Sequence, residues 1–138
     1  MNGFREIEDR DVEAVVALWR ACGLIRPWND PYKDITFARA NINSTLLVLE
    51  RDCVIIASVM TGHDGHRGML YYVGVAPALR RQGIGKQAVK AAESWLKGLG
   101  VWKVTLLVRT ENEAVKGFYE TLGYEVNPVL CMARKIDS

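Results

Sequence analysis

A basic, glycine-rich segment in the middle of the chain has the composition of an anion-binding loop. It reads Arg80-Arg81-Gln82-Gly83-Ile84-Gly85-Lys86 and lies between an apolar run and a stretch with helical periodicity. The first amides of a helix have no partner within the helix, and the helix dipole adds positive charge there. Glycines let an anion approach those amides closely. Residues 80–90 hold four cations and no acid, so the sequence predicts a phosphate-binding site.

Two other phosphate-binding motifs fit this segment less well. A P-loop is excluded because Arg80 and Gln87 occupy the places of its first glycine and its Ser or Thr. The spacing Gly83-x-Gly85-x-x-Ala88 matches a dinucleotide fingerprint, but Thr105 stands where that fold needs an acid. A nucleotide-binding domain therefore remains an alternative, as does a glycine turn that only begins a helix.

Gly74 interrupts the apolar run Met69–Val75. A glycine inside a buried strand often marks a β-bulge or a ligand pressed against the backbone. The alternative is tight packing of the glycine against an aromatic ring.

The elements that must position these residues follow from apolar periodicity. The pattern predicts a mixed α/β fold with one central sheet of about six to seven strands and about four helices, in a single domain over residues 1–138. The expected strands are Phe4–Ile7, Leu46–Leu49, Cys53–Thr61, Met69–Val75, Trp102–Val108, Tyr124–Val126 and Val129–Ile136. The expected helices are residues 11–23, capped by Asp11 and ended by Gly23, Tyr32–Asn43, Ile84–Leu99, and Ala114–Leu122 with Gly123 after it.

Composition limits the partners and the compartment. The chain has 138 residues, 49% hydrophobic and 25% charged, with a net charge of +2, so extensive disorder is excluded and neither nucleic acid nor a membrane is indicated. Cys22, Cys53 and Cys131 form no C-x-x-C pair and lie far from His63 and His66, so no metal site or disulfide framework is expected. We expect buried, reduced thiols in a cytoplasmic protein without a signal peptide or membrane span.

Two motifs together resemble those of a known family. The run Leu70-Tyr71-Tyr72-Val73-Gly74-Val75-Ala76-Pro77, followed by Arg80-x-x-Gly83-x-Gly85, resembles the coenzyme A-binding motif of the GNAT superfamily, the GCN5-related N-acetyltransferases. The segment from Asn112 through Phe118-Tyr119-Glu120 to Gly123-Tyr124 is similar to the motif that follows it. The resemblance covers nearly the whole chain and is strongest to small, stand-alone bacterial members, the YpeA-like acetyltransferases, themselves similar to ribosomal-protein alanine N-acetyltransferases.

The resemblance implies an acetyl-CoA-dependent transfer of an acetyl group to a primary amine by direct attack. Backbone amides of Arg81–Lys86, beside Arg80, would bind the pyrophosphate. The pantetheine arm would pair with Val73 and Val75, whose amides would also polarise the thioester carbonyl. The residues implied for the donor are therefore Val73, Val75, Arg80, Arg81, Gln82, Gly83, Ile84, Gly85, Lys86 and Asn112.

The resemblance also implies that Tyr119 is the general acid that protonates the departing thiolate. Asn112 and Tyr119 are seven residues apart, which places them on one helix face, and a phenol with a pKa near 10 keeps its proton until a thiolate forms. For Tyr119 the alternative is a packed aromatic. For Asn112 it is helix capping, and a capping box at Thr110-x-x-Glu113 competes with that role.

One residue departs from the family pattern. The glutamate that serves as general base in ribosomal N-terminal acetyltransferases is replaced by Leu107. The base is therefore elsewhere, water-mediated or barely needed. Other candidate bases are Tyr71, Tyr72, Glu50, Asp64 and His63, although both histidines are expected to be exposed loop residues.

The acceptor is not fixed by the sequence. The resemblance implies that residues 24–31 help to build its site, with Arg26, Trp28 and Tyr71 as candidate contacts, and that the acceptor is a small-molecule amine or the N-terminus of a peptide or protein. Relatives commonly form homodimers. A non-catalytic acyl-CoA-binding sensor with the same fold is the alternative function, motivated by Leu107.

Overall fold

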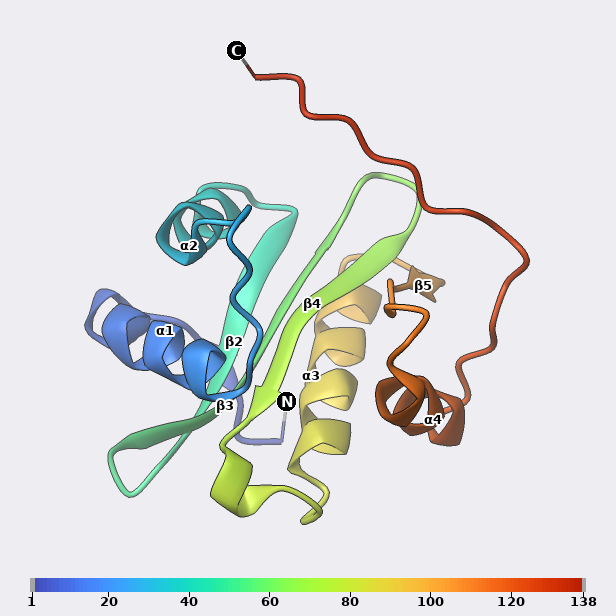
Figure 1. The fold of residues 1–138 in the computed structure, drawn as a ribbon. Helices are drawn as coiled ribbons and strands as arrows, with labels where there is room; N and C mark the ends of the chain where they lie inside the picture. The colour runs from blue at the N-terminus through green and yellow to red at the C-terminus, as the bar shows by residue number, and fades with distance from the viewer. Residues whose placement is uncertain (1, 138) are drawn as a thin grey trace. The chain divides into compact units, whose positions relative to one another are not determined.

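The computed structural model describes residues 2–137 and has a mixed α/β fold (Figure 1). In this part of the chain there is one sheet of five strands. The strands are β1 (Arg5–Glu6), β2 (Ser44–Arg51), β3 (Val54–His63), β4 (Gly68–Val75) and β5 (Val104–Thr105). The α-helices are α1 (Val12–Ala21), α2 (Pro31–Arg39), α3 (Ile84–Gly98) and α4 (Glu113–Thr121), with short 3-10 turns η1 (Asp9–Asp11) and η2 (Pro77–Leu79). The predicted class is confirmed.

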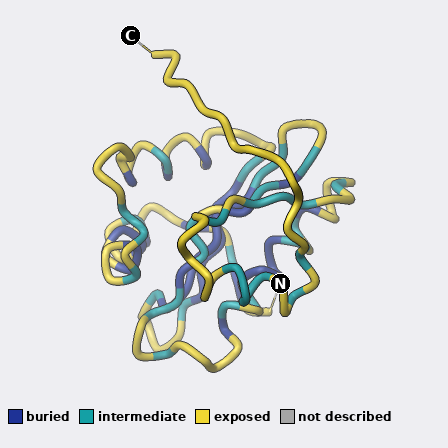
Figure 2. Tube along the Cα trace, turned by 45° about the vertical axis from the view of Figure 1, so that its right-hand side comes forward, coloured by how far each residue is buried: buried dark blue, intermediate teal, exposed yellow. Residues whose placement is uncertain are grey.

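The sheet lies between helices on its two faces. Its order is β1-β2-β3-β4-β5; the first four strands pair antiparallel and β5 joins β4 in parallel. Helices α1 and α2 cover one face and α3 covers the other (Figure 1). Successive residues of β2 point to opposite faces, so Leu46 and Val48 pack with α1 and α2 while Leu47 and Leu49 are buried as well. Buried positions accordingly concentrate in the strands and on the inner helix faces (Figure 2).

Local sequence explains why the central hairpin and the long helix form. Asp52 and Cys53 both have positive φ, 53° and 64°, as a tight two-residue hairpin turn between β2 and β3 requires. In α3 the small and branched residues recur at helical spacing, and Ile84, Ala88, Ala92 and Leu96 are all buried. These two predicted elements are confirmed with small shifts of their bounds.

The prediction is wrong at the two strands expected near the C-terminus. Residues 124–126 and 129–136 form no strand, so the sheet has five strands rather than six or seven. Val126, Val129, Leu130 and Ile136 are all exposed. A run of β-formers becomes a strand only when another strand satisfies its backbone groups, and the apolar pattern carries no information about that partner.

The chain divides into two compact units, one up to Leu106 and one from Leu107 on. The first contains the whole sheet with α1, α2 and α3, and the second contains α4. A single acetyltransferase domain over the full length therefore stays a prediction.

Two further expectations concern membrane helices and cysteine thiols. No helix within residues 2–137 is long and apolar enough to cross a membrane. All three cysteines are free, but Cys53 and Cys131 are exposed and Cys22 is half-buried, so the expectation of buried thiols is wrong.

An ion-pair cluster fastens the N-terminal strand to the first helix. Arg5 donates to both carboxylate oxygens of Asp11, at 2.7 and 3.1 Å, and to Glu50 at 2.7 Å. Asp11 also accepts from the Glu8 amide at 2.8 Å. The Asp11 side chain does not cap α1, so that predicted role is wrong; the carboxylate instead joins β1, η1 and β2.

We predict that Asp11→Asn lowers the free energy of unfolding at pH 7 by about 2 kcal/mol, because it removes the buried charge that pairs with Arg5. The loss is moderate because Arg5 keeps its bond to Glu50 and is partly exposed to solvent. The hydrogen bonds from Arg5 hold the pKa of Asp11 below its ordinary value. This stabilisation is complete above the unfolded-state pKa of about 3.9 and is lost as the pH falls through the lower folded-state pKa. Urea unfolding at pH 7 and pH 3 measures both effects.

The matched control is Asp9→Asn, which removes an exposed carboxylate that pairs with Arg39 at 2.8 Å. We expect it to cost less than about 1 kcal/mol. Equal losses in the two variants, or a gap between wild type and Asp11→Asn that widens on acidification, would contradict the interpretation.

Candidate donor and acceptor site

Strand β4 carries a β-bulge directly before Gly74. Ser58 of β3 is opposite Gly74 and Met60 is opposite Tyr71, so Tyr72 and Val73 together face the single residue between them. Tyr72 has φ of 51°, a left-handed backbone that is costly for a side chain of this size. The irregularity predicted from Gly74 is therefore confirmed.

Gly74 itself permits close packing from the loop after α1. A Cβ at this position would lie 3.2 Å from Leu24 Cδ1 and 3.5 Å from Cys22 Sγ. The neighbours are thus an aliphatic side chain and a thiol, not the aromatic ring of the alternative explanation. The glycine lets the loop that begins at Cys22 cross β4 next to the bulge.

Among residues 2–137, no strand pairs with β4 on one side of the bulge. Strand β5 pairs with the start of β4, where Gly68 lies opposite Val104 and Met69 lies opposite Thr105. On the other side, Ala76 donates to Ile56 of β3 at 2.8 Å and Gly74 is paired with Ser58. Because backbone groups alternate along a strand, the amides of Val73 and Val75 point away from β3. They point toward the part of the β4 edge with which β5 does not pair.

The thiol of Cys22 donates to the Val75 carbonyl at 3.2 Å. This contact could not be predicted from the sequence, because no motif joins Cys22 to Val75. The Cys22 thiol therefore occupies the Val75 carbonyl but not the Val75 amide, which points toward the unpaired part of the β4 edge.

A chain of contacts holds Tyr72 in its unusual backbone conformation. Its ring stacks on buried Trp19, with centroids 3.7 Å apart and planes within 5°. Trp19 Nε1 donates to Ser58 Oγ at 2.9 Å, and Ser58 Oγ donates to the Tyr72 carbonyl at 2.9 Å. The Tyr72 hydroxyl donates to Asp34 Oδ2 at 2.6 Å. Sequence reasoning missed Trp19, Ser58 and Asp34, since no motif joins these positions.

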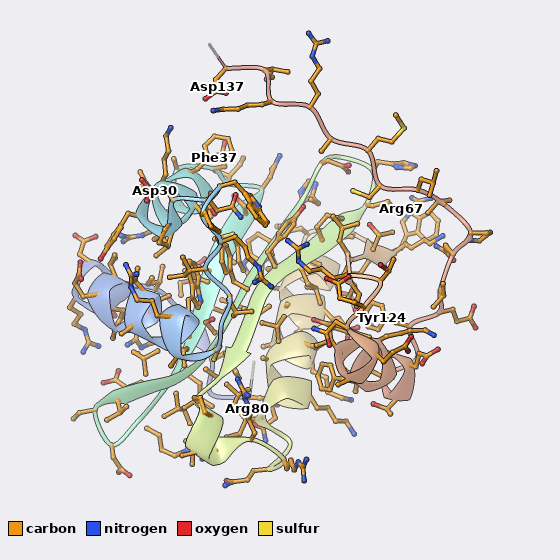
Figure 3. The ribbon with its side chains drawn as sticks, in the orientation of Figure 1. Asp30, Phe37, Arg67, Arg80, Tyr124 and Asp137 are labelled. Carbon is orange, nitrogen blue, oxygen red and sulfur yellow. The ribbon has the colours of Figure 1, made fainter. Side chains whose placement is uncertain are left out.

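The N-terminus of α3 has the features expected of an anion site. Gly83 occupies the N-cap with φ of 81°, and no side chain caps the helix. The first helical bond runs from Gln87 to the Gly83 carbonyl, so the amides of Ile84, Gly85 and Lys86 lack intrahelical partners. Arg80, Arg81 and Gln82 are exposed in the preceding loop, where Arg80 is labelled in Figure 3. This loop follows β4 in the same compact unit.

Helix α4, in the second unit, positions Asn112 and Tyr119. Asn112 Oδ1 accepts from the Val115 amide at 3.1 Å, so the capping role left open by the sequence is confirmed, while Thr110 bonds Glu111 instead. Tyr119 packs edge-to-face between Phe118 and Tyr124, at 5.0 and 5.6 Å. Burial raises the pKa of Tyr119 to about 12, so its phenol is protonated at neutral pH.

Four of the candidate bases are engaged in the structure. Glu50 accepts from Arg5 and lines a hollow of about 520 Å³ between α1 and the β2–β3 hairpin, to which no β4 residue contributes. Asp64 accepts from the His66 and Arg67 amides, which lowers its pKa. His63 is half-buried rather than exposed and accepts from the Gly65 amide.

Tyr72 is the fourth, because burial and the bond to Asp34 raise its pKa well above the ordinary phenol value. A tyrosine that keeps its proton is a hydrogen-bond donor and not a base.

The remaining predicted residues lie on the surface. Arg26 and Trp28 are exposed in the loop between α1 and α2, and Tyr71 is exposed on β4. Leu107 is exposed at the start of the second unit. Among residues 2–137, no group of three or more His, Cys, Asp or Glu side chains is arranged to hold a metal ion.

Comparisons with known proteins identify the family. The chain belongs to the GNAT acetyltransferase family, because residues 12–124 match it. An acetyltransferase from Pectobacterium atrosepticum is 42% identical over 126 residues, which cover 91% of this chain and 89% of the relative. The predicted family and enzyme class, an acyltransferase, are therefore confirmed.

Solved structures agree with the fold. An aminoglycoside N-acetyltransferase in complex with a CoA-linked bisubstrate analogue superposes with a TM-score of 0.82 at 18% identity, covering 97% of both chains. The ribosomal-protein-S18-alanine N-acetyltransferase from Escherichia coli gives a TM-score of 0.72 at 25% identity, over 87% of this chain and 75% of the neighbour.

We predict that Asn112→Ala lowers the free energy of unfolding by about 1 kcal/mol, because the Val115 amide loses its cap. Asn112→Asp keeps an accepting oxygen at the N-cap, so we expect wild-type stability. Thermal unfolding followed by circular dichroism compares the two variants, and equal destabilisation by both would contradict a role in capping.

Proposed function

We propose that the protein is an acetyl-CoA-dependent N-acetyltransferase that acetylates a primary amine by direct attack in a ternary complex. The observation that carries the proposal is the bulged edge of β4, whose Val73 and Val75 amides point away from β3, followed after η2 and a short basic loop by the uncapped N-terminus of α3. The edge of β4 suits an extended, amide-containing chain, and the N-terminus of α3 suits a phosphate. A pantetheine arm joined to a pyrophosphate has both chemistries.

The donor is acetyl-CoA, in keeping with the family and with the CoA-linked analogue held by a structural neighbour. Its pyrophosphate binds the backbone amides of Arg81–Lys86, with the side chains of Arg80, Arg81, Gln82 and Lys86 adding positive charge and donors. Its pantetheine arm adds to β4 as a strand would, through Val73 and Val75. The amide at the bulge also donates to the thioester oxygen and stabilises the negative charge that develops there.

The transfer forms a nitrogen–carbon bond and breaks the carbon–sulfur bond. The amine lone pair attacks the thioester carbon, the electron pair of the broken bond goes to sulfur, and the amine loses one proton to water. Tyr119 gives its phenolic proton to the departing thiolate. Asn112 serves the pantetheine arm through its side-chain N–H groups, since its Oδ1 caps α4.

The acceptor site is formed from the loop between α1 and α2, with Arg26, Trp28 and Tyr71 as contacts. The acceptor is a small-molecule amine or a peptide N-terminus, and the general base is water-mediated. We place the protein in the cytoplasm, where its three free thiols stay reduced, and propose a homodimer as its assembly.

The proposal is tested by isothermal titration with acetyl-CoA and CoA, followed by a screen of an amine library for release of free thiol. We expect micromolar binding and release of CoA with at least one amine. Absence of binding would overturn the proposal. Binding without release for any amine would leave a non-catalytic acyl-CoA-binding module.

We predict that Tyr119→Phe lowers kcat about 100-fold or more, the usual contribution of a general acid, with an unchanged Kd for acetyl-CoA. Tyr124→Phe is the matched control, because it removes one hydroxyl from a ring packed against Tyr119 and leaves the Tyr119 phenol in place. Equal loss in both variants would indicate a packing role for Tyr119.

The raised pKa of Tyr119, about 12, predicts the alkaline behaviour of the enzyme. The acid works only while protonated, so its contribution is complete below pH 11 and is lost as the pH rises through about 12. We expect kcat/KM to rise with the free-amine fraction and to show no decline between pH 8 and about 10.5. A descending limb near pH 10, present in wild type and absent in Tyr119→Phe, would contradict this.

A further inference from the structure

The carboxylate of Asp34 is aimed at the β4 bulge by the bulged residue itself. The Tyr72 hydroxyl donates to Asp34 Oδ2 at 2.6 Å and so joins α2 to β4. Asp34 does not cap its own helix, because Asp30 accepts from the Tyr32 and Lys33 amides. It is half-buried, on the face of the sheet that α1 and α2 cover.

Tyr72 orients this carboxylate without neutralising it. Its hydroxyl keeps its proton, because burial and the bond to Asp34 raise the pKa of Tyr72, and it donates that proton to the Asp34 carboxylate. A carboxylate has about four acceptor sites, and one hydrogen bond occupies a single one of them. Asp34 therefore presents a carboxylate in a fixed orientation that can accept further hydrogen bonds. A positively charged donor is the group that such a carboxylate binds best.

The cation that Asp34 binds is not the nitrogen that attacks the thioester, for two reasons. A whole tyrosine side chain and one hydrogen bond separate the carboxylate from the backbone of the bulge, where the thioester oxygen is bound. An ammonium group held against a carboxylate also keeps its proton, since an opposite charge nearby favours the charged form. The attacking nitrogen must be free of that proton.

We propose that Asp34, oriented by Tyr72, binds a second cationic group of the acceptor, so that the preferred acceptors are diamines or longer amines with two positive charges. This inference rests on the proposed function. One end of such an acceptor, an ammonium, is held at Asp34, while the other end loses its proton to water and attacks the thioester at the bulge. A monoamine lacks the first contact.

The test compares 1,2-diaminoethane through 1,6-diaminohexane with the monoamine of the same carbon number. We expect wild type to prefer the diamine in kcat/KM by about 10- to 100-fold at one or more lengths, the worth of one hydrogen bond to a charged group. The preference should lie in KM rather than in kcat, because the contact is made before and during the reaction alike.

Asp34→Asn should reduce this diamine preference to near one, and Tyr72→Phe, which keeps the ring stacked on Trp19, should reduce it in part. Asp34→Glu, which keeps the charge, should retain most of it. Glu13→Gln and Tyr32→Phe are matched controls, because the Tyr32 hydroxyl donates to Glu13 at 3.0 Å in an exposed pair of the same kind on α1 and α2. Both should keep the wild-type preference.

Titration with acetyl-CoA separates the two proposals. A wild-type protein that binds no acetyl-CoA overturns the proposed function. A protein that acetylates amines but shows no diamine preference, or keeps that preference in Asp34→Asn, overturns the role of Asp34 alone. If Asp34→Asn does not fold, the ratio measured for Tyr72→Phe against Tyr32→Phe decides, since both remove one hydroxyl and keep the ring.

Discussion

The left-handed backbone of Tyr72 is the constraint on which the rest of the site depends. A residue in this conformation costs of order 1–3 kcal/mol and persists only where its surroundings hold it. Here a stacked tryptophan, a serine bonded to the Tyr72 carbonyl, and the Asp34 carboxylate all hold it. The bulge is therefore rigid before any ligand arrives, which is the condition for amides to stabilise charge in a transition state.

Tyr72 lies on a strand that connects to charges of opposite sign. The loop and helix after β4 carry Arg80, Arg81, Lys86 and Lys90 around free amides, a setting for an anionic donor. The side chain of Tyr72 leads instead to Asp34, a setting for a cationic acceptor. The net charge of +2 conceals this division. Two substrates of opposite charge can be drawn to one strand without competing for the same residues.

Much of the fold could be predicted from the sequence, because it follows from local periodicity. The apolar spacing of α3, the β2–β3 hairpin and the glycine before α3 are short-range signals, and the two motifs around Gly83 and Tyr119 identified the family. The cluster of Trp19, Ser58, Tyr72 and Asp34 could not be predicted, since its members meet only when α1, α2, β3 and β4 are assembled. The expected C-terminal strands failed for the related reason that a strand needs a partner.

Leu107 stands where the resemblance to ribosomal N-terminal acetyltransferases implies a glutamate, and this difference does not by itself argue against catalysis. At pH 7, deprotonating an ammonium group with a pKa of about 10.4 into the solvent costs about 4.6 kcal/mol. Passing the proton from the bound ammonium to a carboxylate with a pKa of about 4.3 would cost about 8 kcal/mol, so an ordinary glutamate offers no better route. A base helps only when its environment raises its pKa. A site that binds the acceptor through a second charge, and lets water take the proton from the first, has no need of one.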